Sequence, residues 1–281
     1  MSPVKPIKTF RDLLSFLTII PVGGKEDFVF TTAENVYLFP LIGGFIGLLA
    51  AAYFVGSGFI VRFLFGLVNS VIVLPTDFLS RLAVAAMTVA FLLVITGLQH
   101  FDGLIDLGNA VGLGNMHDRK MVAHAWTVTY AGALLAIIVE FAAFVGLFFV
   151  FSPLLAFAAI IAAEVSAKLA MVTIVWVGKP THKGLGSIFL SKAKKKLNVI
   201  AYGLSALIVY PFFAYALNPL LGLVGVAVVL VSIPVALVME KVSERVFGGV
   251  SGDTIGATNE VARAVTLILL AAMFAVLAIL K

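Results

Sequence analysis

Two acidic side chains stand close together in a chain that contains few acids. The segment HFDGLIDLGNA, residues 100–110, carries Asp102 and Asp106 four positions apart, with Asn109 three positions further on. On a helix with about 100° per residue, these three side chains share one stripe about 60° wide. Two carboxylates and an amide on one stripe predict a site for a hard cation such as Mg²⁺, with Asp102 and Asp106 as the catalytic acids.

The alternative for this segment is a helix cap, because Asp is common and stabilising at helix starts. A cap accounts for one acid but not for three oxygen-bearing side chains on one stripe. We therefore favour the cation site, and ask which elements would hold it.

The composition of the chain indicates whether those elements fold in water or in a membrane. The 281 residues are 62% hydrophobic and 12% charged, with a mean hydropathy of +1.16, whereas soluble domains carry about 25% charged residues. The apolar character extends over residues 1–281, so we expect an all-α polytopic membrane protein with a single integral membrane domain. The absence of cysteine excludes disulfides and thiolate metal sites. The net charge of +5 reports loop topology rather than a nucleic-acid partner.

Seven apolar runs are long enough, or nearly so, to cross about 30 Å of hydrocarbon. We expect spans near Tyr37–Ile60, Leu82–Leu98, Tyr130–Phe151, Leu154–Val177, Val199–Leu217, Leu220–Val238 and Val261–Leu280. The apolar stretch Val61–Leu74 is interpreted as an interfacial turn region. Residues 7–17 suit either an N-terminal amphipathic helix on the membrane surface or a plain basic flank.

Positive charge predicts the orientation of these spans. Of the 19 Lys and Arg residues, 14 fall on the side of the N-terminus, three on the other side and two within spans. The positive-inside rule therefore favours a cytoplasmic N-terminus and an external C-terminus in the cell membrane. The three most polar loops, 99–129, 178–198 and 239–260, then share the cytoplasmic face, where we expect the active site.

A glycine-rich segment precedes the last predicted span. Residues Gly248–Glu260, GGVSGDTIGATNE, include Gly252, which permits close backbone approach to a ligand. Asp253 offers a further carboxylate for the cation site, and N–H groups at the start of the last helix suit a phosphate. The alternative is a connector capped by Thr258 or Asn259.

Cations and intramembrane charges complete the set of candidates. In the loop 178–196, Lys179 and Lys183 beside flexible glycines suit a polyanionic substrate such as a nucleotide diphosphate. Glu164 and Lys168, four apart inside the fourth predicted span, and Glu140 in the third are either a structural group or the wall of a polar cavity.

These segments, in this order, resemble the cobalamin synthase family of adenosylcobinamide-GDP ribazoletransferases. FLTIIPV followed by YLFPLIGGFIGLL resembles the opening of the family, HFDGLIDLGNA its acidic motif, GLGSIF its mid-chain glycine motif and GGVSGDTIGATNE its closing motif. The resemblance covers nearly the whole chain. Two positions depart from the family pattern: Asn109 stands where a third acid is usual, which should weaken metal binding, and Ala125 stands at an acid position of the segment 123–132.

The resemblance implies a reaction. The hydroxyl of α-ribazole, or of its 5′-phosphate, attacks the phosphate attached to cobinamide in adenosylcobinamide-GDP, and GMP leaves. Phosphoryl transfer of this kind needs positioning and a divalent ion that neutralises charge. We expect these small molecules and membrane lipid as partners, with a homo-oligomer also compatible with the chain. The metal ligands would be Asp102, Asp106, Asn109 and Asp253, and the substrate-binding residues Lys179, Lys183, Gly252, Thr254, Asn259 and Glu260.

Two other functions are compatible with parts of the pattern. The Asp-Gly-x-x-Asp core also resembles the CDP-alcohol phosphotransferases, which perform related chemistry at a membrane face. A transporter would use Glu164, Lys168 and Glu140 as a polar path. The clustering of polar residues on one face, rather than through the bilayer midplane, favours the enzyme.

Overall fold

The computed structural model describes residues 4–22, 28–123, 125, 127–150, 152–181 and 184–280. Within these ranges the chain is helical, apart from an isolated β-bridge between Pro180 and Val250. The α-helices are α1 (Val4–Leu17), α2 (Phe28–Glu34), α3 (Phe39–Asn69), α4 (Thr76–Ile95), α5 (Gln99–Val111), α6 (Met116–Ala123), α7 (Tyr130–Phe148), α8 (Pro153–Val177), α9 (Leu185–Lys192), α10 (Val199–Ala216), α11 (Pro219–Val229), α12 (Ser232–Phe247) and α13 (Gly252–Ile279).

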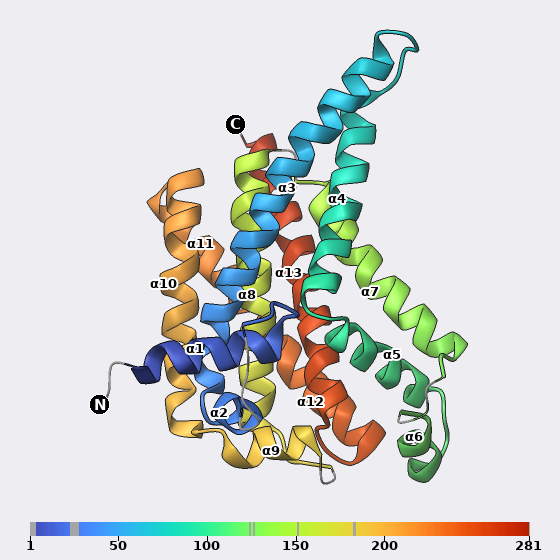
Figure 1. Ribbon diagram of the computed structural model, residues 1–281, viewed down its shortest axis with the longest axis vertical. Helices are drawn as coiled ribbons and strands as arrows, with labels where there is room; N and C mark the ends of the chain where they lie inside the picture. The colour runs from blue at the N-terminus through green and yellow to red at the C-terminus, as the bar shows by residue number, and fades with distance from the viewer. Residues whose placement is uncertain are drawn as a thin grey trace.

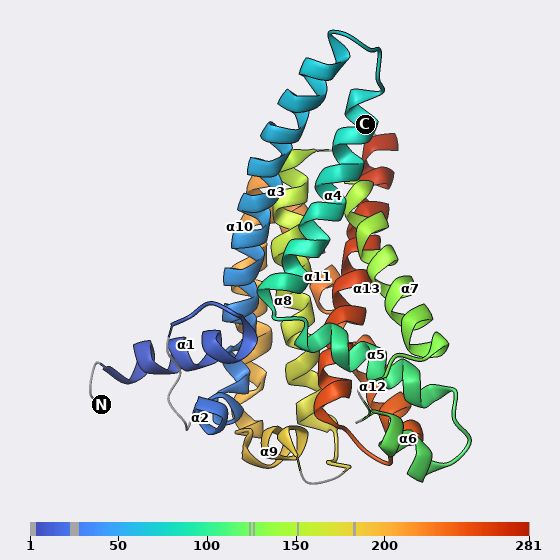
Figure 2. The same cartoon turned by 45° about the vertical axis from the view of Figure 1, so that its right-hand side comes forward.

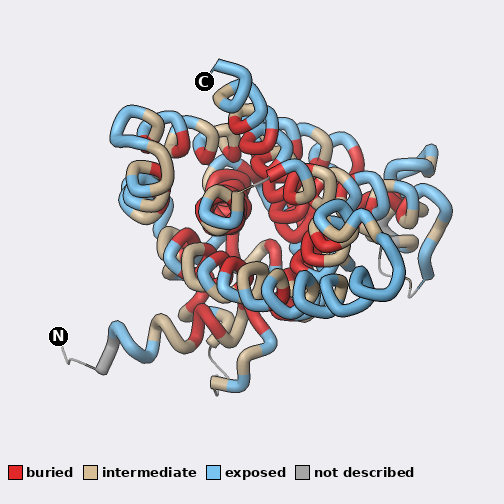
Figure 3. The backbone as a smooth tube through the Cα atoms, turned by 90° about the horizontal axis from the view of Figure 1, so that it is seen from above, coloured by how far each residue is buried: buried red, intermediate tan, exposed pale blue. Residues whose placement is uncertain are grey.

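Helix α8 is the centre of the bundle. Every one of its residues from 158 to 175 is buried, and α3, α10, α12 and α13 pack around it. Seen from above, the buried residues lie towards the inside of the bundle and the exposed residues on its outer surface (Figure 3). A helix that is buried on all sides needs a surface that is apolar or paired. In the buried stretch of α8 the polar side chains with side-chain hydrogen bonds are Glu164, Ser166, Lys168 and Thr173, and each has a partner.

Small residues set the closest helix contacts. A Cβ atom on Gly43 of α3 would lie 2.6 Å from the carbonyl oxygen of Glu164, and one on Gly47 would lie 2.7 Å from the Cα of Ile161. The backbones of α3 and α8 therefore touch along a small-xxx-small stripe, a common way to associate helices in lipid. The run YLFPLIGGFIGLL thus serves packing.

The seven predicted spans are confirmed in number. Seven helices or helix pairs are long and apolar enough to cross a membrane within the described ranges. The expected interfacial turn at Val61–Leu74 is wrong for its first nine residues, because α3 continues to Asn69 and spans about 46 Å at 1.5 Å per residue. Gly66 does not end the helix, since a helical glycine costs only about 1 kcal/mol. The turn instead comprises residues 70–75, and Pro75 directly precedes α4.

The sixth span is broken at Leu230–Val231, between α11 and α12. Pro234 has no N–H, and the N–H of Ile233 donates to Leu230 rather than to Val229. The hydroxyl of Ser166, on α8, donates to the freed carbonyl of Val229 at 3.3 Å. Such a break is tolerated at membrane depth because protein, not lipid, supplies the missing hydrogen bond.

The polar elements gather at one end of the bundle. Helices α5, α6 and α9 and the adjoining ends of α12 and α13 lie at the end drawn at the bottom, while the C-terminus and the α3–α4 turn lie at the other end (Figures 1 and 2). The expected N-terminal amphipathic helix is α1, which crosses the bundle helices at a steep angle and buries Leu13, Leu14 and Leu17. The three loops that the sequence placed on one face therefore do share one end.

Candidate functional site

Helix α5 presents the two predicted acids at the polar end. Gly97 and Leu98 have φ angles of +68° and +60°, and this left-handed turn directs the chain out of α4 into α5. Asp102 lies in the first turn of α5 and is exposed, and Asp106 lies one turn further and is partly buried. The N-cap position is Leu98, without a side-chain cap hydrogen bond, so Asp102 does not act as the cap.

Two glycines bring α5 into backbone contact with α13. A Cβ atom on Gly103 would lie 2.5 Å from the carbonyl oxygen of Asp253, and one on Gly256 would lie 3.1 Å from the Cα of His100. Side chains at either position would separate the two helices. The crossing therefore places Asp253, at the start of α13, next to the acids of α5.

The three acids share one electrostatic environment. The pKa of Asp106 is raised to about 7, first by burial and then by the carboxylates of Asp102 and Asp253. Mutual repulsion among carboxylates is the property that a bound cation relieves. Their side chains are not gathered into a preformed cage, since no group of three or more His, Cys, Asp or Glu in the described part of the chain is spaced to hold a metal ion.

A cavity of about 690 Å³ opens beside the acids. Asp102, Gly252 and Asp253 line it, whereas Asp106 lies outside its lining. Helix α8 contributes Met171, and α1, α2, α3 and α9 form the wall facing α5 and α13. The predicted residues Asp102, Gly252 and Asp253 are thus brought together at one cavity by segments about 150 positions apart.

The start of α13 differs from the expectation. The last span begins at Gly252 rather than Val261, and the cap is neither Thr258 nor Asn259 but Ser251, whose hydroxyl accepts a hydrogen bond from the N–H of Thr254 at 3.2 Å. Much of the predicted loop is therefore helix. Its first turn, not a flexible connector, faces the cavity, with its N–H groups at the positive end of the helix dipole.

Asn109 has a different task from the one predicted. Its amide oxygen accepts hydrogen bonds from the N–H and the hydroxyl of Thr129, at 2.9 and 2.8 Å, and its amide nitrogen donates to the carbonyl of Thr127 at 2.9 Å. Both lone pairs of the amide oxygen are used, so none is left for a cation in this arrangement. Asn109 fastens the segment before α7 to α5, and we leave it out of the metal ligands.

Three of the predicted substrate-binding residues are buried inside the bundle. The hydroxyl of Thr254 lies 2.7 Å from that of Ser243 and 3.0 Å from that of Ser251, within the cap of α13. Asn259 and Glu260 are at most 1% exposed. A substrate in the cavity cannot touch these side chains without opening the helices, so the assignment of direct contact is wrong for this structure.

Asn259 and Glu260 belong to a buried ion cluster, which we define as Glu164, Lys168, Asn259, Glu260 and Arg263. The ammonium of Lys168 donates to Asn259 Oδ1 at 2.7 Å and approaches Glu164 Oε2 at 3.4 Å. The guanidinium of Arg263 donates to Glu164 Oε1 at 2.5 Å and to Glu260. The cluster joins α8 to α13, which supports the structural interpretation of Glu164 and Lys168.

His100 connects the ion cluster to the cavity. It lines the cavity, and its Nδ1 lies 3.8 Å from Glu260 Oε1. Burial, followed by the charges of Lys168 and Arg263, holds the pKa of His100 well below its usual value, so the imidazole is neutral. Arg263 was not identified from the sequence as the partner of Glu164. Charged residues within spans are few and usually pair with one another, so this scarcity could have indicated the pair.

The predicted lysines are not part of the cavity lining that the structure describes. Lys179 is exposed, and its carbonyl accepts a hydrogen bond from the N–H of Val250 at 2.7 Å, which ties the loop after α8 to the loop before α13. Lys183 lies outside the described residues. Gly186 of α9 packs on this junction, where a Cβ atom would lie 2.6 Å from the nitrogen of Gly252.

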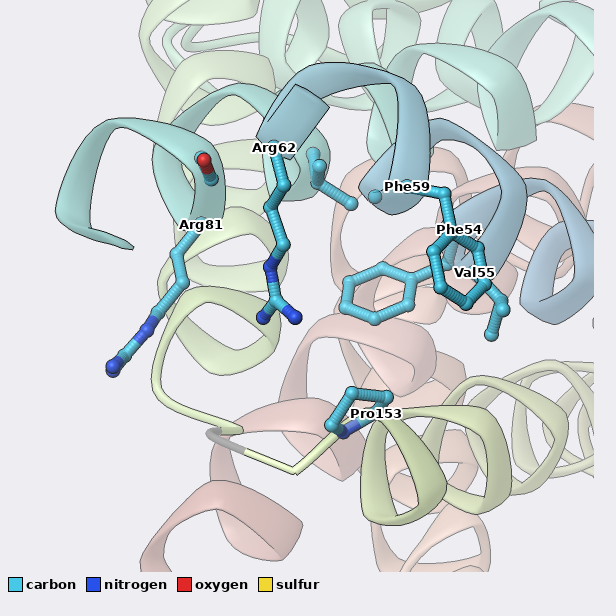
Figure 4. Close-up of a pocket in the computed structure, with 9 residues that line it drawn as sticks. Phe54, Val55, Phe59, Arg62, Arg81 and Pro153 are labelled. Atoms are coloured by element: carbon cyan, nitrogen blue, oxygen red, sulfur yellow. The ribbon is translucent and has the colours of Figure 1, made fainter. Parts of the chain in front are cut away.

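A second pocket lies at the other end of the bundle, where α8 begins. It measures about 70 Å³ and is lined by Phe54, Phe59, Arg62, Arg81 and Pro153, among others (Figure 4). It contains no carboxylate and is small. The larger acidic cavity is therefore the candidate site.

Fold and site together define the class of this protein: it is a polytopic membrane protein with an acidic cavity at one end. Glycines and the N-terminus of a helix border the cavity. Such a cavity suits a polyanionic substrate that binds together with a cation. The family model of cobalamin-5-phosphate synthases matches residues 9–271. Proteins named adenosylcobinamide-GDP ribazoletransferase are similar over nearly the whole chain. That of Methanocella arvoryzae is 31% identical over 90% of this chain and 91% of its own length, and that of Thermococcus onnurineus 30% over 93% and 96%. The chain belongs to the cobalamin-5-phosphate synthase family, as its motifs predicted, and no solved structure matches it.

Proposed function

We propose that this protein transfers the cobinamide phosphate of adenosylcobinamide-GDP to the hydroxyl of α-ribazole or its 5′-phosphate. The hydroxyl oxygen bonds to the phosphorus next to cobinamide, the bond from that phosphorus to the bridging oxygen breaks, and GMP leaves with that oxygen. The hydroxyl proton is lost. Family membership supports the reaction, and the observation that carries it is the meeting of Asp102 and Asp253 at one cavity.

We further propose that the enzyme depends on Mg²⁺, held by Asp102, Asp106 and Asp253. The donors are hard oxygens, and the pKa of Asp106 is raised first by burial and then by the carboxylates of Asp102 and Asp253, whose charge a cation would compensate. When bound, Mg²⁺ would neutralise phosphate charge. The chain itself orients the diphosphate: the first N–H groups of α13 favour an anion, and the glycine at 252 lets it approach.

Lys179 and Lys183 remain proposed contacts for the substrate phosphates, because their loop is tied by Lys179 to the start of α13. A cation that binds the diphosphate in both ground and transition states should act on affinity. We expect Lys183→Ala to raise the KM for adenosylcobinamide-GDP more than it lowers kcat. A loss confined to kcat would contradict this role.

We also propose that the acidic cavity faces the cytoplasm of the cell membrane. The excess of Lys and Arg on that side supports this orientation. Water-soluble nucleotide substrates would then reach the cavity without crossing the bilayer, while membrane lipid surrounds the spans.

The test is incubation of the purified protein with adenosylcobinamide-GDP, α-ribazole and Mg²⁺, with GMP and the cobalamin product measured by chromatography. We expect GMP release that a chelator stops and Mg²⁺ restores. Asp102→Asn should lower the rate by about 100-fold or more, whereas Asp77→Asn, an exposed acid of α4 that pairs with Arg81, should not. Uptake of substrate into sealed vesicles without GMP release would overturn the proposal in favour of a transporter.

A further inference from the structure

The cavity has two walls of unlike chemistry. On one side α5 and α13 bring Asp102, Asp253 and glycine backbone. The other side is aromatic, and we name as the aromatic wall the four phenylalanines that line it, which come from α1, α2, the start of α3 and α9: Phe16, Phe28, Phe39 and Phe189. The acids and helix N-terminus suit phosphates, so the aromatic wall is left for another part of a substrate.

The rings of the aromatic wall adjoin one another but are tilted, with angles between the ring planes of 39° for Phe16 and Phe189, 52° for Phe16 and Phe28, and 60° for Phe39 and Phe189. The centroids of Phe16 and Phe189 are 5.0 Å apart, those of Phe16 and Phe28 are 6.3 Å apart, and those of Phe39 and Phe189 are 6.2 Å apart. Phe39 and Phe189 are at most 4% exposed, whereas Phe16 and Phe28 are partly exposed. Phe39 and Phe189 are therefore packing residues of the wall, and Phe16 and Phe28 are the rings that a ligand in the cavity can contact.

The polar groups on this wall are few. The cavity is lined on this side by described residues of α1, α2, α3 and α9, and one of these residues, Ser15, has a polar side chain. The hydroxyl of Ser15 is buried and has no hydrogen-bond partner. An apolar wall with one hydroxyl accepts a flat base that needs one hydrogen bond. It discriminates against a base with several donors and acceptors, because each group buried without a partner costs free energy.

The two bases in the proposed reaction differ in this respect. Guanine carries a carbonyl, a ring N–H and an amino group on its edges. The base of α-ribazole is a dimethylbenzimidazole, which is flat and apolar and has one free ring nitrogen that accepts a hydrogen bond. That nitrogen matches the hydroxyl of Ser15, which has no hydrogen-bond partner within the protein and would turn about the Cα–Cβ bond to meet it.

We propose that the aromatic wall is the subsite for the benzimidazole base of the acceptor, packed against the two tilted rings of Phe16 and Phe28 with its ring nitrogen bonded to Ser15. This inference rests on the proposed function, because that function supplies the acceptor. It divides the cavity: the acceptor base lies against α1, α2 and α9, and the diphosphate lies against α5 and α13. The phosphorus is then attacked from the side of the aromatic wall.

The test measures binding of each substrate part separately. Equilibrium dialysis gives the Kd of purified protein for α-ribazole and, independently, for GDP with Mg²⁺. We expect Phe16→Leu and Phe28→Leu each to raise the Kd for α-ribazole by roughly tenfold, the loss typical of one stacked ring, and to leave the Kd for GDP within about twofold. Phe10→Leu is the matched control, since Phe10 is also on α1 but packs against Phe45, with centroids 6.0 Å apart, away from the cavity lining.

Ser15→Ala separates recognition from packing. It should weaken binding of α-ribazole several-fold but leave unchanged the binding of a riboside whose base lacks the free ring nitrogen. An equal effect on both ribosides would overturn the role of Ser15. A raised Kd for GDP with an unchanged Kd for α-ribazole would assign the wall to guanine and overturn the proposal, as would no change in either Kd.

Failure of the proposed function gives a different result. If the wild-type protein binds α-ribazole through Phe16 but releases no GMP, the subsite stands and the transferase reaction falls. If it releases GMP while the phenylalanine variants keep the wild-type Kd and KM for α-ribazole, the reaction stands and the subsite falls.

Discussion

The ionisation of Asp106 is strongly affected by its surroundings. Burial and then the carboxylates of Asp102 and Asp253 raise its pKa from 3.8 to about 7. A carboxyl group whose pKa is raised in the folded state opposes folding once it ionises. Its cost is therefore absent at pH values below the unfolded pKa and is fully present above pH 7.

We expect Asp106→Asn to make the protein more stable and less active. In chelator at pH 8 its Tm should rise by about 2 °C, a modest shift because Asp106 is only partly buried and water screens its charge. At pH 5, which lies between the unfolded pKa of 3.8 and the folded pKa of about 7, the rise should shrink to less than half, and it should vanish only below the unfolded pKa. GMP release should fall by about 100-fold or more. Thermal unfolding at the two pH values is the measurement, with Asp77→Asn as the control, and a lower Tm at pH 8 would contradict the prediction.

Asn109 shows how residue type and residue use can differ. Its spacing from Asp102 and Asp106 is that of a ligand stripe, but its side chain makes three hydrogen bonds to Thr127 and Thr129. An amide can donate and accept at once, which suits it to fasten a backbone segment, whereas an ionised carboxylate in its place could only accept.

At the scale of elements, the crossing of α5 and α13 builds the acidic side of the cavity. Gly103 and Gly256 permit backbone contact there, and the ion cluster fixes α13 against α8 from the other side. Charges this deep persist because they are paired, and removing one partner would leave the other buried and uncompensated. The position of Asp253 is thus set by contacts with two helices.

We expect Gly103→Ala to impair the enzyme although alanine favours helix. Its Cβ would lie 2.5 Å from the carbonyl oxygen of Asp253, so α5 and α13 must separate. The rate of GMP release should fall by about 100-fold or more, because displacement of about 1 Å in a catalytic constellation has effects of that order. Gly112→Ala is the control at the end of the same helix, since its Cβ would meet Ala131 at an ordinary 3.8 Å. Equal activities of the two variants would show that the close contact is not needed.

At the scale of the whole molecule, the bundle separates two ends. An odd number of spans places the N- and C-termini on opposite sides, as Figure 1 shows. Helices α5 and α9 and the start of α13, which line the acidic cavity, lie at one end with α1, and the α3–α4 turn lies at the other. The charge asymmetry therefore predicts the orientation of the acidic cavity as well as that of the chain.

We expect single-cysteine labelling to confirm this orientation. Because the sequence contains no cysteine, only the introduced residue can react with the label. Ser70→Cys, in the exposed turn after α3, should react with a membrane-impermeant maleimide in intact cells. Asn115→Cys, exposed before α6, should react only after the cells are opened. The reverse pattern would place the cavity outside the cytoplasm and contradict the orientation.

The amino-acid sequence by itself determined the class of fold, the number of spans and the placement of the two acids of α5 on one side of a helix. These properties are local: a run of about 20 apolar residues requires a helix in lipid, because its backbone groups find no other partners there. Likewise, the i, i+4 spacing places Asp102 and Asp106 on one stripe of any helix that contains them.

Only the tertiary structure decided which polar residues meet the cavity. It buried Thr254, Asn259 and Glu260, placed Asp253 beside α5, and paired Glu164 with Arg263, 99 positions away. It also assembled the aromatic wall from four helices whose phenylalanines look like ordinary core residues in the sequence. Helix periodicity tells which residues share a face of one helix. Which face meets which neighbour depends on close packing between distant segments, and here glycines and buried ion pairs determine it.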